Sequence, residues 1–175
     1  MPTKRWNLLP SEPLTDLPVH RQYFEYADAY LDSADRLCRI LAVSPRKASF
    51  QRGAVVLYLV QHALELFYKG AILRKKPAER ISHGVSKLRA RYLSLYPRKD
   101  CHVRPTFVSS YESLTKEERE YAMKHEPPGD QLFRYPEDKT GTPWFGLHAF
   151  EASSFCTEIS GLKSEFARAC AKIDA

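Results

Sequence analysis

The sequence is poor in glycine, with 7 glycines among 175 residues. It has no Gly-rich loop that could cradle phosphates, no Gly-x-Ser-x-Gly motif and no His-Glu-x-x-His motif. These absences exclude P-loop nucleotide hydrolases, hydrolases with the usual nucleophile turn and zincin metalloproteases. The hydrophobic content of 43% and the aromatic content of 12% exclude a disordered chain.

Cysteine is also scarce, and no two cysteines form a Cys-x-x-Cys pair. Cys101 and His102 are adjacent, but a zinc site would need two further ligands from elsewhere. A free cysteine usually behaves as a small buried hydrophobic residue. We therefore expect no metal site and no cofactor.

Long apolar runs are absent as well. No run reaches the roughly 18 residues that a membrane span requires, and residues 1–6 contain no apolar signal core. We therefore expect a cytoplasmic protein without a membrane partner. A chain of this length can bury about 70% of its unfolded surface, so it should fold as one domain.

Prolines and apolar spacing predict the organisation of the chain. Residues 1–19 are rich in proline and are predicted to form an extended arm, followed by a single helical domain over 20–175. Three-four spacing of apolar residues predicts helices over 20–43, 52–75, 82–96 and 148–173. The fold class is therefore all-α: an up-and-down bundle of four to five helices. A long, partly irregular excursion over about 97–146, with a short helix at 113–124, precedes the last helix.

The first of these helices has a predicted inner face with regular three-four spacing, formed by Tyr23, Ala27, Tyr30, Ala34, Leu37 or Cys38, and Leu41. The helix over 52–75 is apolar nearly all round, which indicates a central helix enclosed by its neighbours. Its polar residues Gln61, Glu65 and Lys69 form one stripe, in which Glu65 and Lys69 have the favourable order for a helical ion pair. Because an unpaired buried charge is costly, the stripe either lines a cleft or pairs with itself.

Positive charge is concentrated in one segment of the chain. Residues 74–104 carry ten basic and two acidic side chains, a net charge of +8, whereas the whole protein has +6. Such a density of cations, interleaved with Tyr92 and Tyr96, is typical of a surface that contacts phosphates and stacks on bases. The alternative is a solvated basic face that serves solubility.

Three segments carry a family resemblance. They are His62-Ala-Leu-Glu-Leu-Phe-Tyr-Lys69-Gly-Ala-Ile-Leu73, then His83-Gly-Val-Ser-Lys-Leu88 after a short basic loop, and Phe133-Arg-Tyr-Pro136. Together they resemble the HEPN (higher eukaryotes and prokaryotes nucleotide-binding) superfamily over about residues 50–173. The resemblance implies a helical bundle that often forms a homodimer. It also implies activity on RNA, or a role in defence or toxin–antitoxin systems beside a cognate nucleotidyltransferase-type protein.

The chain departs from the nuclease members of that superfamily. They carry an Arg closely followed by a His near the last helix, whereas here His148 precedes Arg168. One formal match lies elsewhere, at Arg119 and His125. In such a pair the Arg would neutralise the scissile phosphate and the His would move the proton of the ribose 2′-hydroxyl, without a metal. Acidic neighbours would repel a phosphate there, namely Glu117, Glu118 and Glu120.

The sequence therefore predicts a non-catalytic, homodimeric HEPN-like domain that binds RNA, a nucleotide or a protein partner. Its predicted binding residues are Glu65, Lys69, Arg74, Lys75, His83, Arg89, Arg91 and Arg134. Two alternatives remain. One is a metal-independent ribonuclease using Arg119 and His125, and the other is a structural dimerisation module whose basic segment serves solubility alone.

Overall fold

A computed structural model describes residues 12–44, 46, 49–81, 83–105, 115–117, 120, 137, 140–141 and 150–174. In this part of the chain the main elements are the helices α2 (Val19–Val43), α3 (Phe50–Lys75), α4 (Val85–Leu95) and α7 (Ala152–Asp174). A helical turn, α1 (Glu12–Thr15), precedes them, and a 3-10 turn, η2 (Lys99–Cys101), follows α4. The predicted all-α bundle is confirmed. Within the predicted extended arm, however, residues 12–15 are helical.

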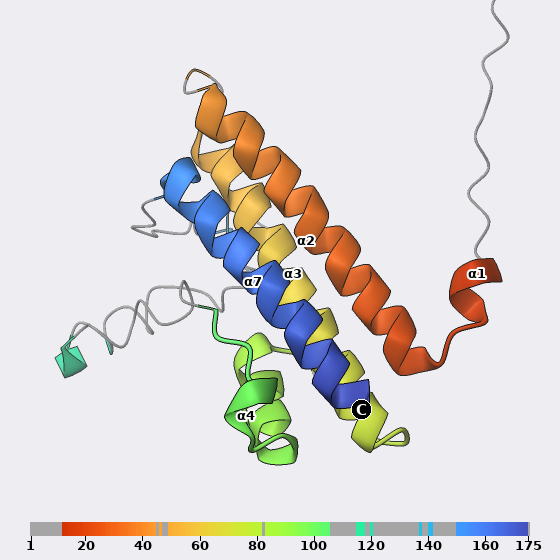
Figure 1. Ribbon diagram of the computed structural model, residues 1–175. Helices are drawn as coiled ribbons and strands as arrows, with labels where there is room; N and C mark the ends of the chain where they lie inside the picture. Colours follow the sequence, from red (N-terminus) through yellow and green to blue (C-terminus); the bar gives the residue numbers. More distant parts are fainter. Residues whose placement is uncertain are drawn as a thin grey trace, which may run out of the picture.

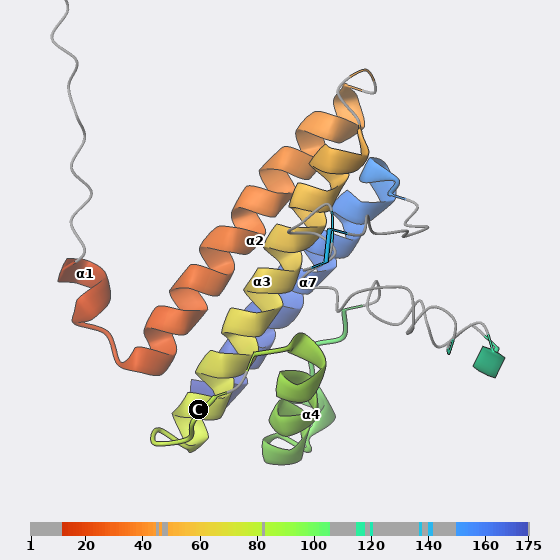
Figure 2. The same ribbon diagram turned by 180° about the vertical axis from the view of Figure 1, so that it is seen from behind.

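The three long helices lie side by side (Figure 1). The short connection over 44–49 makes α2 and α3 antiparallel, and α7 also runs antiparallel to α2. The shorter α4 packs on the C-terminal half of α3, at the end of the bundle where α7 ends (Figure 2). Residues 74–104 are thereby gathered at one end of the molecule.

The predicted central position of α3 is confirmed. Its Phe67 is fully buried and lies against a ring from each neighbouring helix. The ring centroids are 5.5 Å apart for Phe24 of α2, 5.7 Å for Tyr92 of α4 and 4.4 Å for Phe166 of α7. Phe67 therefore joins all four helices. Burial of a side chain of this size stabilises the fold by about 2–3 kcal/mol.

By length and composition alone, α3 also resembles a membrane span. Its most apolar 18-residue window has a mean hydropathy of 1.2, but 61% of that window is buried inside the bundle. The apolar character of α3 is therefore matched by its burial among the neighbouring helices.

The inner face of α2 agrees with the prediction at Ala27, Ala34, Cys38 and Leu41 and differs from it at two positions. The buried residues are Phe24, Ala27, Leu31, Ala34, Cys38 and Leu41. Tyr23 and Tyr30, which were predicted to face the core, are instead half-buried at its edge. Tyr23 and Tyr30 belong to a neighbouring stripe with the same helical spacing, and Phe24 and Leu31 are buried in their place. In α7, by contrast, one stripe of apolar residues at three-four spacing faces the core: Phe155, Ile159, Leu162, Phe166, Ala169 and Ile173 are buried.

Local side-chain and backbone chemistry sets the helix ends. α3 begins before residue 52, because the Ser49 hydroxyl accepts a hydrogen bond from the Arg52 N–H at 3.4 Å. The Glu151 carboxylate caps α7 by accepting from the backbone N–H groups of Ser153 and Ser154. A hydrogen bond from the Ser154 side chain and these two backbone bonds lower the pKa of Glu151 to about 2. α4 begins at Val85 rather than at residue 82, since Gly84 has a positive φ of 108°.

A close approach joins α2 to α3 at Gly70. A Cβ atom at this position would lie 2.8 Å from the Phe24 ring and 2.9 Å from the His20 carbonyl oxygen. Glycine therefore allows the two helices to come closer than any other residue would.

The predicted short helix over 113–124 falls largely outside the described residues. Of its positions, 115–117 and 120 are described; residues 116, 117 and 120 are helical and residue 115 is not.

Candidate functional site

The polar stripe on α3 forms a three-membered network with the start of α4. Lys69 Nζ donates to Glu65 Oε1 at 2.6 Å, and His83 Nδ1 lies 3.0 Å from the same oxygen. Glu65 and Lys69 are only 8% and 9% exposed. The predicted pairing of the stripe with itself is therefore present, and His83 joins it from the loop before α4.

The charges in this network compensate one another. Burial by itself would raise the pKa of Glu65, but the hydrogen bonds from Lys69 and His83 outweigh it and hold that pKa below its ordinary value. Glu65 is thus an anion that can only accept hydrogen bonds, so His83 Nδ1 must be the donor toward it. Since Lys69 has no acceptor, its contact with His83 Nδ1 at 3.4 Å is a close approach between two donors.

His83 is the part of this network that a ligand can reach. Its side chain is 85% exposed, whereas that of Glu65 is 10% exposed. With Nδ1 held by Glu65, the other ring nitrogen is available to accept a hydrogen bond, or to donate one when the ring is protonated. The network therefore fixes an exposed imidazole at the N-terminal end of α4.

Two predicted phosphate contacts, Arg74 and Lys75, have partners inside the protein. Arg74 Nε lies 3.8 Å from Asp174 Oδ1, in a cluster that also includes Arg21 and His20. Lys75 Nζ donates to the Leu95 carbonyl oxygen at 2.7 Å, and it lies 4.4 Å from the centroid of the Tyr96 ring. These contacts hold the end of α3 against α7 and the end of α4.

The two arginines predicted on α4 have different surroundings. Arg91 forms a two-pronged pair with Glu79, with Nε–Oε1 at 2.8 Å and Nη2–Oε2 at 2.7 Å. Arg89 is half-buried beside the Tyr68 hydroxyl, and its Nε is buried with no hydrogen bond of normal geometry. Arg91 thus serves to hold α4 to the preceding loop.

Other cations at this end of the bundle are more accessible. Five exposed basic residues form no ion pair with any described residue: Lys76, Arg80, Lys87, Lys99 and Arg104. The two acidic residues of the segment are engaged, Glu79 by Arg91 and Asp100 by Arg98 at 2.5 Å. The net positive charge of residues 74–104 therefore faces solvent.

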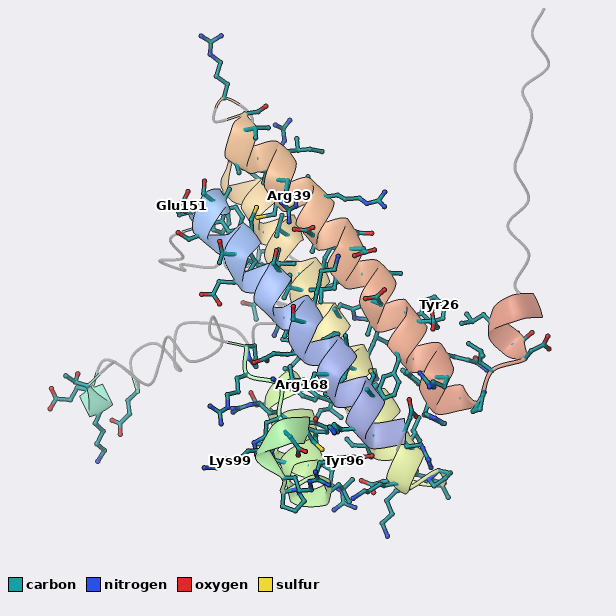
Figure 3. The ribbon with its side chains drawn as sticks, viewed as in Figure 1. Tyr26, Arg39, Tyr96, Lys99, Glu151 and Arg168 are labelled. Carbon is teal, nitrogen blue, oxygen red and sulfur yellow. The ribbon has the colours of Figure 1, made fainter. Side chains whose placement is uncertain are left out.

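Arg168 of α7 joins this surface from a distant part of the sequence. Its Nε donates to the Asp100 carbonyl oxygen at 3.2 Å and its Nη2 to the His102 carbonyl oxygen at 2.7 Å. Arg168 lies where α7 passes the end of the bundle that carries α4 and η2 (Figure 3). Both acceptors are neutral carbonyl groups, so these contacts do not balance its positive charge. No local signal in the sequence points to this role, since 66 positions separate Arg168 from His102.

The predicted stacking of bases on Tyr92 and Tyr96 is wrong. Tyr92 is fully buried and Tyr96 is 5% exposed, and their rings pack together with centroids 5.2 Å apart. The Tyr96 hydroxyl donates to the Ala71 carbonyl oxygen at 2.9 Å, and that of Tyr92 donates to the Cys101 carbonyl oxygen. These rings attach α4 to the core, so the basic surface offers charge without those aromatic platforms.

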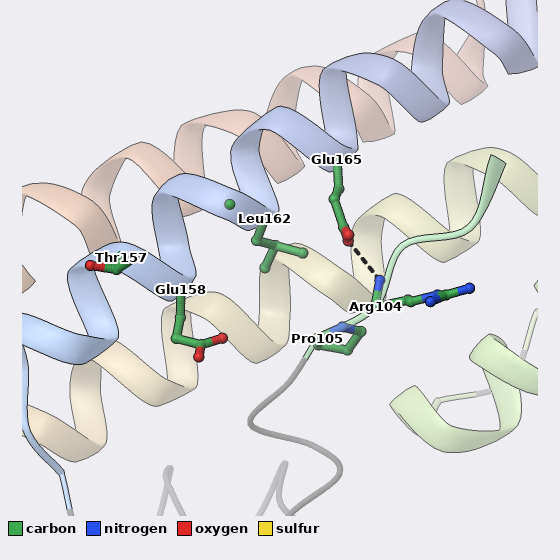
Figure 4. A pocket seen from close by; sticks show the side chains of 7 residues that line it. Arg104, Pro105, Thr157, Glu158, Leu162 and Glu165 are labelled. Atoms are coloured by element: carbon green, nitrogen blue, oxygen red, sulfur yellow. Dashed lines mark hydrogen bonds between the residues drawn. The ribbon is translucent and has the colours of Figure 1, made fainter. Parts of the chain in front are cut away.

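A shallow pocket of about 230 Å³ lies between α7 and the segment after η2 (Figure 4). Leu162 and Pro105 supply apolar walls, and the Glu165 carboxylate accepts from the Arg104 backbone N–H at 2.7 Å. The Arg104 guanidinium points away from Glu165. With two carboxylates in its lining, Glu158 and Glu165, this pocket repels phosphate and is separate in chemistry from the basic surface.

Several sequence predictions fall outside the described residues. Arg119, His125 and Arg134 are among them, so the ribonuclease alternative and the Arg134 contact remain predictions. Among the described residues, no group of three or more His, Cys, Asp or Glu side chains could hold a metal ion. No model of a known family, no curated protein and no solved structure matches the chain.

Proposed function

We propose that the protein is a HEPN-like helical domain that binds RNA through the basic end of its bundle. The observation that carries this proposal is the set of exposed, unpaired cations described above, at an end where both acidic residues of the segment are already engaged. Cations that face solvent release counterions from a nucleic-acid backbone and provide salt-dependent affinity.

The fixed positions of the basic side chains at this end of the bundle also support the proposal. Lys87 lies on the first turn of α4, one turn after His83, which Glu65 holds in place. A protonated His83 could donate to the same phosphate backbone as Lys87. The Glu65–Lys69–His83 network would thus orient one contact, while Lys75, Arg74 and Arg91 fix the helices that carry the others.

The proposed binding is tolerant of sequence. Base stacking by Tyr92 and Tyr96 is unavailable to it, so affinity would come from phosphate contacts. The choice of RNA among polyanions follows the family resemblance, as do the proposed setting in a defence or toxin–antitoxin system and the cytoplasmic location. A cognate nucleotidyltransferase-type protein would be the partner in that setting.

Fluorescence anisotropy with a labelled single-stranded RNA over a series of salt concentrations tests the proposal. The slope of log affinity against log salt should fall by about 0.7 for each lost phosphate contact. Lys87→Gln and Lys99→Gln should each reduce this slope by about 0.7. Both side chains are exposed and form no ion pair with a described residue.

Arg46→Gln is the matched control, because Arg46 is exposed in the connection at the opposite end of the bundle. Its slope should equal that of the wild type. No binding by the wild type, or an equal loss in the control, would contradict the proposal. A DNA strand of the same length shows whether RNA is preferred.

A further inference from the structure

Two of the four free cysteines lie together where α2 packs on α7. Cys38 of α2 is fully buried, and its thiol donates to the Ala152 carbonyl oxygen at 3.2 Å. This carbonyl belongs to the first turn of α7, one turn before Cys156. A helical side chain leans toward the N-terminus of its helix, so the Cys156 thiol lies over the same turn. The thiols of Cys38 and Cys156 are in hydrogen-bond contact.

The backbones of α2 and α7 approach closely at this level. A cysteine side chain is short, so its sulfur reaches a carbonyl oxygen of another helix only where the two backbones are near each other. A second contact lies one turn farther along α7, where Arg39 Nη2 donates to Ser160 Oγ at 3.4 Å. Arg39 and Glu151, the residue before α7, lie near the same end of the bundle (Figure 3). A disulfide joins Cα atoms about 4.4–6.8 Å apart, so it requires helices that approach in this way.

The two thiols differ in their access to solvent. Cys156 is half-buried at the edge of the core, whereas Cys38 is not exposed at all. Burial, together with the hydrogen bond to Cys156, holds the pKa of the Cys38 thiol well above its ordinary value. Since the accessible thiol of a pair reacts first, a small oxidant would meet Cys156 before Cys38.

We propose that Cys38 and Cys156 are a redox-active pair, which a hydroperoxide oxidises to a disulfide between α2 and α7. In the first step the Cys156 sulfur attacks the terminal peroxide oxygen and the O–O bond breaks. Cys156 becomes a sulfenic acid, and its thiol proton leaves with the released alcohol, or with water when the oxidant is hydrogen peroxide. In the second step the Cys38 sulfur attacks the Cys156 sulfur, and the Cys38 proton leaves with the displaced hydroxide as water. The two sulfurs lose two electrons, which the peroxide bond gains.

The disulfide would tie the end of α2 to the start of α7. The covalent loop that it closes would contain α3 and α4. Because such a link restricts the unfolded chain, the oxidised protein should unfold at a temperature roughly 5–15 °C higher than the reduced protein. Oxidation would thus stabilise the bundle from the end opposite to the basic surface, without altering any residue of that surface.

Treatment of the full chain with hydrogen peroxide, followed by intact mass spectrometry, tests the proposal. The mass should fall by about 2 Da as two thiol hydrogens are lost, and peptide mapping should find Cys38 linked to Cys156. Cys38→Ala should instead retain a sulfenic acid at Cys156, which dimedone labels, because no second thiol is there to displace it. Cys170→Ser is the matched control, since Cys170 lies about 21 Å farther along α7. It should form the same disulfide as the wild type.

The same treatment in urea, with the helices separated, should remove the preference for this link over other pairings of the four cysteines. Circular dichroism shows that each variant is folded. The proposal would be overturned by a native protein that keeps all four thiols, that pairs its cysteines at random, or that oxidises Cys156 to a sulfinic acid without linking it to Cys38. All of these outcomes can be read in the absence of RNA.

Discussion

The α2–α3–α7 bundle and the α4 segment are held in place by different interactions. Inside the bundle, the rings of Phe24, Phe67 and Phe166 pack together in the core, and polar links between the helices, such as Lys163 to Asp32 and Arg21 to Asp174, lie at its edge. α4 also buries apolar residues, but polar contacts tie it down at both ends, from His83 to Glu65 and from Lys75 to the Leu95 carbonyl. A change in the bundle should therefore unfold the whole domain, whereas a change at the polar ties of α4 should open one segment.

The largest expected effect comes from Phe67→Ala, which should destabilise the α2–α3–α7 bundle and the α4 segment together. Phe67 contacts rings from α2, α4 and α7, so its loss leaves a cavity that no single helix can close. We expect the free energy of unfolding to fall by about 4 kcal/mol, measured by urea denaturation. A loss below about 1 kcal/mol would mean that the four helices do not share this centre.

The next largest effect concerns the Glu65–Lys69 pair, at which the α4 segment joins the bundle. Glu65→Leu leaves Lys69 buried without its partner and should cost about 3 kcal/mol, as should Lys69→Met alone. The double variant Glu65→Leu/Lys69→Met should recover most of that loss, because neither charge is left buried. A double-mutant cycle by urea denaturation measures the coupling, and purely additive losses would contradict a buried pair.

Acid should weaken the same junction. Since the folded protein lowers the pKa of Glu65, its carboxylate stabilises the fold fully above the ordinary pKa of 4.5. This contribution is lost as the pH falls below 4.5 through the folded-state pKa. The free energy of unfolding of Glu65→Gln should therefore depend less on pH in this acid range than that of the wild type.

A smaller effect, of about 2 kcal/mol, is expected from Gly70→Ala at the seam of α2 and α3. The added methyl group would meet the His20 carbonyl, which cannot move without shifting α2. Gly161→Ala is the control, because a Cβ there meets nothing within 4 Å. It should stabilise α7 by up to about 1 kcal/mol, so thermal unfolding of the two variants should shift in opposite directions.

The smallest expected effect is confined to α4. Arg91→Gln removes the exposed pair with Glu79 and should leave the global unfolding transition nearly unchanged. Hydrogen exchange should nevertheless become faster in α4, with no change in α2 or α7, because this pair holds α4 to the loop before it. Faster exchange in all helices would show that α4 and the bundle open as one unit.

The sequence predicted those parts of the fold that have one regular apolar stripe. In α7 the spacing from Phe155 to Ile173 identifies the buried face, and α3 was placed at the centre because it is apolar all round. In α2 four of the six predicted inner positions are buried, but Phe24 and Leu31 face the core in place of Tyr23 and Tyr30, since both pairs have helical spacing. Which of two stripes is buried depends on the neighbouring helices, and a single helix does not contain that information.

The candidate site was predicted less completely. The pairing of Glu65 with Lys69 is local, four residues apart, and it could be predicted from spacing. The third member, His83, is 18 residues from Glu65 and joins through the docking of α4. The same docking buries Tyr92 and engages Arg91, so the density of basic residues indicated the charged end but not which cations remain free.

The order of helices along the chain has a consequence for synthesis. α2 and α3 are neighbours in sequence, so they can pair as soon as both have left the ribosome. α7, which covers Phe67 through Phe166, begins only at Ala152, after α3 has ended at Lys75. At about 5–20 residues per second, the nascent hairpin waits roughly 4–15 s with this aromatic surface uncovered. A chaperone that binds apolar surface would therefore find most of it exposed during this interval of translation.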